Sequence, residues 1–205
     1  MSTTNTKTHL KMYAIMYVEC SVHSKYAQIF SKRYILGEGF FGKGLVAIRV
    51  QKIYLETTMF NYYYDTERDA HADTVKLFEE VKAGKYLAFT SVYAVQELSK
   101  APEGKRDKML ELISEYGIAT LGLSDEAEKL AEFYMREGII PKKYETDGVH
   151  IAVAAVNDLD MIISLNFRHI VKKKTIEMTE LVNIREGYRK VQIYTPMEVV
   201  ENDCE

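Results

Sequence analysis

From residue 51 onward, short apolar runs alternate with longer stretches of helical pattern. The apolar runs have the length of strands and lie at residues 51–56, 85–90, 118–123, 161–164 and 191–194. The helical stretches lie at residues 67–83, 91–100, 106–116, 147–157 and 174–190, and one more begins after Ser124. Strands that alternate with helices build βαβ units, in which a parallel sheet is covered on both faces. We therefore predict an α/β fold, a three-layer α/β/α sandwich with a central, mainly parallel sheet.

Three residues support the helix boundaries. Ser91 and Ser124 each precede a helical stretch, and serine is a favoured N-cap because its hydroxyl accepts a hydrogen bond from a free backbone N–H. Gly117 follows the helix at residues 106–116, and glycine ends helices readily because it tolerates a left-handed backbone. The stretch at residues 147–157 is rich in alanine and valine, so this helix is expected to be buried.

The first 49 residues do not follow the alternation. Residues 2–9 are polar, and four glycines at positions 37, 39, 42 and 44 punctuate a stretch without a clear hydrophobic period. We place a boundary near Arg49. Residues 1–49 are expected to form an N-terminal extension that is disordered or not native, and residues 50–205 the folded domain.

The glycines in this extension invite a nucleotide-binding interpretation. Gly37, Gly39 and Gly42 have the spacing GxGxxG, and LGEGFFGKG resembles the glycine-rich loop of a protein kinase. However, Arg49 stands where a kinase has lysine, and no HRD or DFG segment follows. No clear strand precedes Gly37 and no helix opens after Gly42, as a dinucleotide-binding loop would require. A lone GxGxxG is a weak signal, and we do not expect a nucleotide site here.

The composition excludes several classes of protein. Apolar residues make up 47% of the 205 residues, which is enough for a sizeable core and too much for a wholly disordered chain. No apolar run is long enough to cross a bilayer, so we expect a cytoplasmic protein without a membrane contact. Cys20 and Cys204 lie at opposite ends of the chain, without the spacing of a zinc site or a disulfide framework. The net charge of −3 excludes a general polyanion binder of the histone kind.

Four polar residues follow strands or lie on the helices next to them. Glu56 ends the run IYLE, Glu97 lies in the helix after the second strand, Asp147 opens the buried helix, and Asn166 follows the strand MIIS. The carboxyl ends of parallel strands open onto the crevice where ligands bind, so the topology could bring all four to one edge. Taken singly, each has an ordinary interpretation as a solvated carboxylate, a helix-start acid or a turn residue.

In their local contexts, these residues resemble the PIN-domain family, which includes the VapC-like ribonuclease toxins of bacterial toxin–antitoxin pairs. The matching segments are IYLETTMFN, TSVYAVQEL and, most specifically, KYETDGVHIAVAAVNDLDMIISLNFRHI. The tail IREGYRKVQIYTPMEVV also fits the family. The resemblance covers about residues 50–200, in order and without large gaps, so it implies a PIN-like domain at residues 50–205.

The resemblance implies a divalent-metal-dependent endoribonuclease. Glu56, Glu97 and Asp147 would hold Mg²⁺ or Mn²⁺, because hard divalent ions take oxygen ligands. By the same analogy Asn166 would be a catalytic residue that orients a water or a phosphate oxygen, and Thr57 would help to position the site. The family also implies an RNA substrate, an antitoxin protein as partner and a homodimer.

Two departures from the family pattern keep other functions open. The family most often has aspartate where this chain has Glu56, and it often has an acid where this chain has the neutral Asn166. Fewer charges predict weaker metal binding, or one tightly held ion instead of two. The alternatives are a catalytically weakened PIN-like module for protein interaction, and an RNA-processing enzyme or DNA nuclease without an antitoxin.

Other residues are candidates for RNA contacts. Lys142-Lys143 forms one basic group, and Arg168, His169 and Lys172–Lys174 form another; both could hold an RNA backbone or be ordinary solvated charges. Tyr62–Tyr64 could stack bases, although core packing or an antitoxin groove explains them equally well. His150 precedes the apolar Ile151 and is interpreted as a buried core histidine with its hydrogen bonds satisfied.

Overall fold

The computed structural model describes residues 34–38, 45–122 and 124–201. The chain divides into two units, Met1–Val50 and Gln51–Glu205. In the first unit, β1 (Tyr34–Glu38) pairs antiparallel with β2 (Leu45–Arg49). The expectation that no clear strand precedes Gly37 is therefore wrong, because β1 begins at Tyr34 and includes Gly37, which pairs with Val46. Antiparallel pairing needs only extended backbone, which these tyrosine-, isoleucine- and valine-containing segments favour without an amphipathic period. Gly39 and Gly42, and the rest of the predicted extension, lie outside the described residues.

The second unit is built on a five-stranded parallel sheet with the strand order β5-β4-β3-β6-β7. Its strands are β3 (Gln51–Leu55), β4 (Tyr86–Ser91), β5 (Ala119–Leu121), β6 (Met161–Ile163) and β7 (Gln192–Tyr194). Every pair in this sheet is parallel. Helices or helical turns connect the strands, and the predicted α/β class with a central parallel sheet is confirmed.

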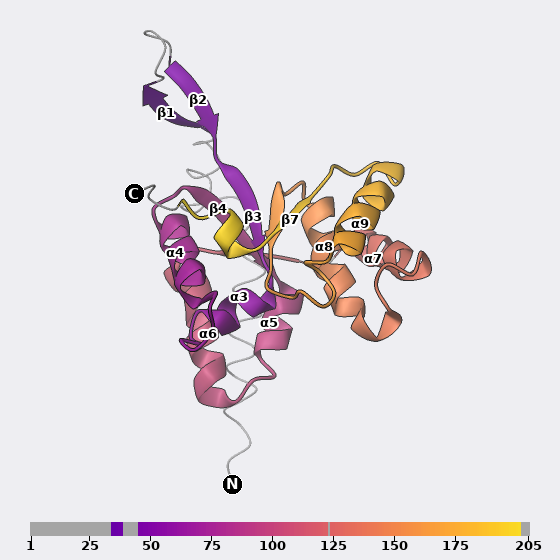
Figure 1. The fold of residues 1–205 in the computed structure, drawn as a ribbon, viewed down its shortest axis with the longest axis horizontal. Coiled ribbons are helices and arrows are strands. Elements are labelled where there is room, and N and C mark those ends of the chain that lie inside the picture. Colours follow the sequence, from indigo (N-terminus) through magenta and orange to yellow (C-terminus); the bar gives the residue numbers. More distant parts are fainter. Residues whose placement is uncertain (1–33, 39–44, 123, 202–205) are drawn as a thin grey trace. The chain divides into compact units, whose positions relative to one another are not determined.

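Helices cover both faces of the sheet (Figure 1). They are α3 (Thr57–Tyr62), α4 (His71–Lys82), α5 (Val92–Leu98), α6 (Glu103–Glu115), α7 (Asp125–Arg136), α8 (Glu145–Val156) and α9 (Lys173–Arg185). Along β3, Tyr54 joins the core cluster beneath α7, α8 and α9, whereas Ile53 and Leu55 join the cluster beneath α3, α4 and α6. This alternation is that of a strand buried on both faces, and it makes the unit a three-layer sandwich.

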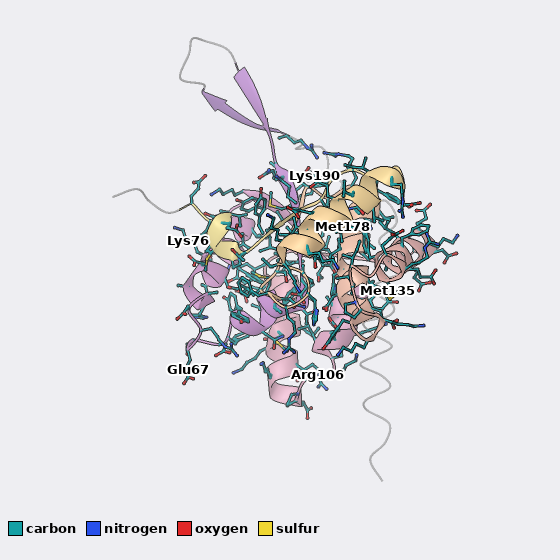
Figure 2. The ribbon with its side chains drawn as sticks, turned by 45° about the vertical axis from the view of Figure 1, so that its right-hand side comes forward. Glu67, Lys76, Arg106, Met135, Met178 and Lys190 are labelled. Atoms are coloured by element: carbon teal, nitrogen blue, oxygen red, sulfur yellow. The ribbon has the colours of Figure 1, made fainter. Side chains whose placement is uncertain are left out.

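The side chains of the two helical layers can be followed in Figure 2. Met135 on α7 and Met178 on α9 lie on one side, and Glu67 and Lys76 on the other. The helix α8 packs in the layer of α7 and α9 and is buried from Gly148 to Ala155, as its alanine- and valine-rich sequence predicts. No helix in the described ranges is long and apolar enough to span a membrane.

The predicted helix ends are confirmed. The Ser91 hydroxyl accepts a hydrogen bond from the backbone of Ala94 at 3.3 Å, and that of Ser124 accepts one from Ala127 at 3.2 Å. Gly117 has φ +62°, the left-handed backbone that ends α6. The helix α3 was not expected, because its six residues are too few to show a helical period.

The strand order brings three chain segments to one edge of the sheet. The strand β3 lies between β4 and β6, so the residues that follow these three strands are neighbours. Glu56 directly follows β3, and its backbone N–H donates to the carbonyl of Ile163 at the end of β6 at 3.2 Å. The helix α5 begins directly after β4 and carries Glu97. The fold therefore positions the candidate site at the carboxyl ends of the central strands.

Candidate acidic metal site

Glu56 is buried, with 3% of its surface exposed, and it caps the N-terminus of α3. Its Oε2 accepts hydrogen bonds from the backbone of Thr58 at 3.1 Å, from the Thr58 hydroxyl at 2.6 Å and from the Ser164 hydroxyl at 2.9 Å. A buried carboxylate without such donors would be costly. The local sequence thus supplies two of the three donors, and Ser164, which directly follows β6, supplies the third.

Glu97 is held from two sides. Its Oε2 accepts hydrogen bonds from the Thr57 hydroxyl at 2.5 Å and from His150 Nε2 at 2.9 Å. Burial raises the pKa of Glu97, but the hydrogen bond and charge of His150 and the hydrogen bond of Thr57 outweigh it, so the pKa lies below the usual value. Thr57 therefore contacts the site as the resemblance implies.

His150 is a site neighbour that the sequence did not identify. Its side chain is 1% exposed, and its Nδ1 lies 2.7 Å from the Tyr54 hydroxyl, which lies 2.6 Å from the Ser91 hydroxyl. Burial lowers the pKa of His150, but its hydrogen bond to Glu97 and the charges of the nearby acids raise it overall. His150 is buried and both of its ring nitrogens have hydrogen-bond partners, as expected, but one of these partners is Glu97 of the site. Its spacing of three residues from Asp147 on one helix was the signal that could have found it.

Asp147 and Asn166 form the other half of the site. The Asn166 side chain donates to Asp147 Oδ1 at 2.9 Å. Burial, and then the charge of Glu56, raise the pKa of Asp147 from 3.8 to about 6. Asn166 is itself fixed, because its backbone N–H donates to the Ser164 hydroxyl at 3.0 Å and its side-chain oxygen accepts from the backbone of His169 at 3.1 Å. Asn166 therefore orients one oxygen of Asp147.

The structure brings the four residues singled out from the sequence to one place. One ligand atom each from Glu56, Glu97 and His150 lies within 4.8 Å of the others. Asp147 is outside that set, but the charges of Glu56 and Glu97 both raise its pKa, so the three carboxylates interact. We call Glu56, Glu97 and Asp147 the acidic cluster.

The acidic cluster fits a hard divalent cation. The hydrogen bonds that the described residues make to it use Oε2 of Glu56, Oε2 of Glu97 and Oδ1 of Asp147. In the part of the chain that the structure describes, no donor contacts the other oxygen of each carboxylate, which is Oε1 of Glu56, Oε1 of Glu97 and Oδ2 of Asp147. Oxygen ligands of this kind suit Mg²⁺ or Mn²⁺, and a cation would relieve the repulsion among the three charges.

The two predicted basic groups meet beside Asn166. Tyr144, at the end of the 3₁₀ turn Lys142–Tyr144, stacks on His169 with ring centroids 3.8 Å apart. Burial lowers the pKa of His169, and the charges of Arg168, Lys172 and Lys143 lower it further. We call these three exposed cations the basic rim.

The tyrosines at residues 62–64 have mainly structural contacts. Tyr62 and Tyr63 are partly buried and pack against the core cluster beneath α4 and α6. The Tyr63 hydroxyl lies 2.7 Å from that of Tyr116, and the Tyr64 hydroxyl donates to the carbonyl of Lys108 at 3.1 Å. Core packing is thus the interpretation that these contacts favour.

Comparisons with known proteins add a structural likeness only. No family model matches the chain, and no curated protein matches it. Among solved structures, it is similar to Mycobacterium tuberculosis VapC20, described as a sarcin-ricin loop cleaving toxin, with 12% identity, a TM-score of 0.42, and coverage of 54% of this chain and 86% of that one. It is also similar to VapBC2 from Rickettsia felis, bound to a fragment of promoter DNA, with 13% identity, a TM-score of 0.46, and coverage of 71% and 98%. The chemistry of this chain is therefore judged from its own site residues.

Proposed function

We propose that residues 50–205 form a PIN-like nuclease domain that hydrolyses RNA phosphodiester bonds with the help of a divalent metal ion. The observation that carries this proposal is the convergence of Glu56, Glu97 and Asp147, each with one carboxylate oxygen that no described donor occupies. Burial and the charge of Glu56 raise the pKa of Asp147, so its ionised form costs folding free energy when no cation is bound. Groups with strongly shifted pKa values cluster at functional sites, and Asp147 is such a group.

Glu56, Glu97 and Asp147 would hold Mg²⁺ or Mn²⁺. A cation bound there supplies an activated water for in-line attack on phosphorus and neutralises charge that develops on the phosphate. The protein side chains do the positioning: Thr57 and His150 fix Glu97, and Asn166 fixes Asp147. Asn166 is uncharged, so it does not add to the repulsion that a phosphate would meet at the site.

We propose further that the protein is the toxin of a toxin–antitoxin pair, cytoplasmic and homodimeric, and silenced by an antitoxin protein. This part rests on the sequence motifs IYLETTMFN, TSVYAVQEL and SLNFRHI. Expression of the chain alone should then arrest growth, and co-expression of the product of the adjacent gene should restore it. Harmless expression of a protein that cleaves RNA would favour an RNA-processing enzyme without an antitoxin.

A catalytically weakened PIN-like interaction module is the second candidate. It is favoured by the burial of Glu56, whose Oε2 accepts three hydrogen bonds and is therefore little available to a ligand. The two functions differ in one measurable property, which is cleavage.

The test is metal-titrated cleavage of a mixed RNA pool. Wild type should cleave with Mg²⁺ or Mn²⁺ and stop in EDTA, and Glu56→Gln, Glu97→Gln and Asp147→Asn should each abolish cleavage while remaining folded. Glu145→Gln is the matched control, because Glu145 is an exposed acid in the same first turn of α8 as Asp147. Cleavage by Asp147→Asn at the wild-type rate would refute the site, and the absence of cleavage by wild type with either metal would favour the interaction module.

A further inference from the structure

Phe167 is a large apolar side chain in an unusual position. It is 57% exposed, and it directly follows Asn166, whose amide contacts the acidic cluster. Two hydrogen bonds hold the turn that carries it. The backbone N–H of Phe167 donates to the carbonyl of Leu165, and that of His169 donates to the Asn166 side-chain oxygen, at 3.1 Å each. An isolated exposed apolar residue is common on protein surfaces. Its neighbours are what distinguish this one.

Those neighbours are cations. Arg168 follows Phe167 in the same turn, and Lys143 and Lys172 are close enough to His169 for their charges to act on it. The stack of Tyr144 on His169 joins the two chain segments, and Lys143 Nζ lies 4.7 Å from the centre of the Tyr144 ring. Among the described residues, no ion pair involves Lys143, Arg168 or Lys172. The surface therefore combines an aromatic face with uncompensated positive charge.

We propose that Phe167 stacks against an unpaired base of single-stranded RNA, next to the phosphate that enters the acidic cluster, while the basic rim holds the flanking phosphates. Aromatic side chains between cations bind single strands because every base offers a face for stacking and every nucleotide carries a negative charge. A base inside a duplex cannot reach Phe167, since it is already stacked and paired. This inference deepens the proposed function and rests on it: Phe167 is the residue that binds an unpaired base beside the acidic cluster.

A protein partner fits this surface less well. A docked helix or strand would need a contiguous apolar area, whereas Phe167 is bordered by Asn166 and Arg168. An acidic peptide would match the charge but leave the aromatic face without a specific role. Single-stranded RNA uses both features.

The experiment measures binding separately from cleavage. Fluorescence anisotropy in EDTA follows a short labelled single-stranded RNA and the same sequence as a duplex, on wild type, Phe167→Ala, Phe167→Trp and Ile184→Ala. Ile184 is the matched control, because it is 58% exposed and lies on α9. Loss of one base stack should weaken single-strand binding by roughly 5- to 150-fold. Phe167→Trp should restore it, and Ile184→Ala should have no effect.

Two further measurements separate stacking from charge. Arg168→Gln should reduce the slope of log affinity against log salt by about 0.7, the value for one phosphate contact on a single strand, whereas Phe167→Ala should leave that slope unchanged. An oligonucleotide carrying 2-aminopurine should lose fluorescence when its base stacks on wild type, and not on Phe167→Ala. The chain has no tryptophan that would interfere.

The inference is overturned if Phe167→Ala binds single strands like wild type, if wild type binds the duplex equally well, or if an acidic peptide binds and RNA does not. Failure of the proposed function has a different signature. In that case single strands bind through Phe167 in EDTA, but no metal restores cleavage.

Discussion

Replacement of Asp147 by asparagine removes one charge from the acidic cluster and leaves the size of the side chain unchanged. The hydrogen bond with Asn166 can be kept, because the amide still offers an oxygen to the Asn166 side chain. If the cluster exists to hold a cation, this change should stabilise the protein without metal. If Asp147 is only a helix-start acid, the same change should destabilise it.

The pKa of Asp147 sets the size of the effect. Burial and the charge of Glu56 raise it from 3.8 to about 6, which at roughly 1.4 kcal/mol per pH unit is at most about 3 kcal/mol of folding free energy. Asp147 is partly exposed, so solvent screening reduces this to about 1–2 kcal/mol. Loss of the favourable interaction with the α8 dipole costs about 0.3–1 kcal/mol. We expect a net gain of about 1 kcal/mol, or roughly 2–4 °C in melting temperature.

The pH dependence has a defined sign. Because the folded-state pKa of Asp147 lies above its unfolded value, its contribution is most favourable below about pH 4 and is lost as the pH rises through about 6. The advantage of Asp147→Asn over wild type should therefore grow from about pH 5 to about pH 7.5. An aspartate that only complements the helix dipole would give the opposite trend.

Thermal melting in EDTA and in excess Mg²⁺, at both pH values, measures these effects. Wild type should gain stability with metal by mass action, and Asp147→Asn should gain less. The control Glu145→Gln removes an acid from the same turn and should respond to metal like wild type. A lower melting temperature for Asp147→Asn than for wild type in EDTA near neutral pH, or equal metal stabilisation of all three proteins, would refute the reasoning.

Three other changes test the surroundings of the site. Ser164→Ala should lower the free energy of unfolding by about 1–3 kcal/mol in urea titrations, because the buried Glu56 loses a donor; no change would show that this donor is dispensable. Tyr54→Phe should lower the free energy of unfolding by a similar amount, about 1–3 kcal/mol, because the buried His150 Nδ1 loses its hydrogen-bond partner. An unchanged free energy of unfolding would show that this hydrogen bond does not stabilise the fold. Deletion of residues 1–49 should leave the melting temperature of the remaining domain unchanged, and a large fall would place the boundary elsewhere.

The sheet and most of the helices could be predicted from the sequence because their signals are local. A buried strand is a short apolar run, an amphipathic helix repeats every three to four residues, and Ser91, Ser124 and Gly117 mark helix ends by hydrogen bonds or backbone angles within a few residues. The hairpin of β1 and β2 and the short helix α3 were missed, since neither contains a period long enough to detect.

The site had to be decided by tertiary structure. The sequence, with its family resemblance, singled out Glu56, Glu97, Asp147 and Asn166, but the partners that orient them lie far along the chain. Ser164 is 108 residues from Glu56, and His150 is 53 residues from Glu97. Such contacts depend on the order of strands in the sheet, which no local pattern encodes. For the same reason the turn of His150 toward the acids and the exposure of Phe167 beside them could be seen only in the folded chain, where the carboxyl ends of β3, β4 and β6 come together.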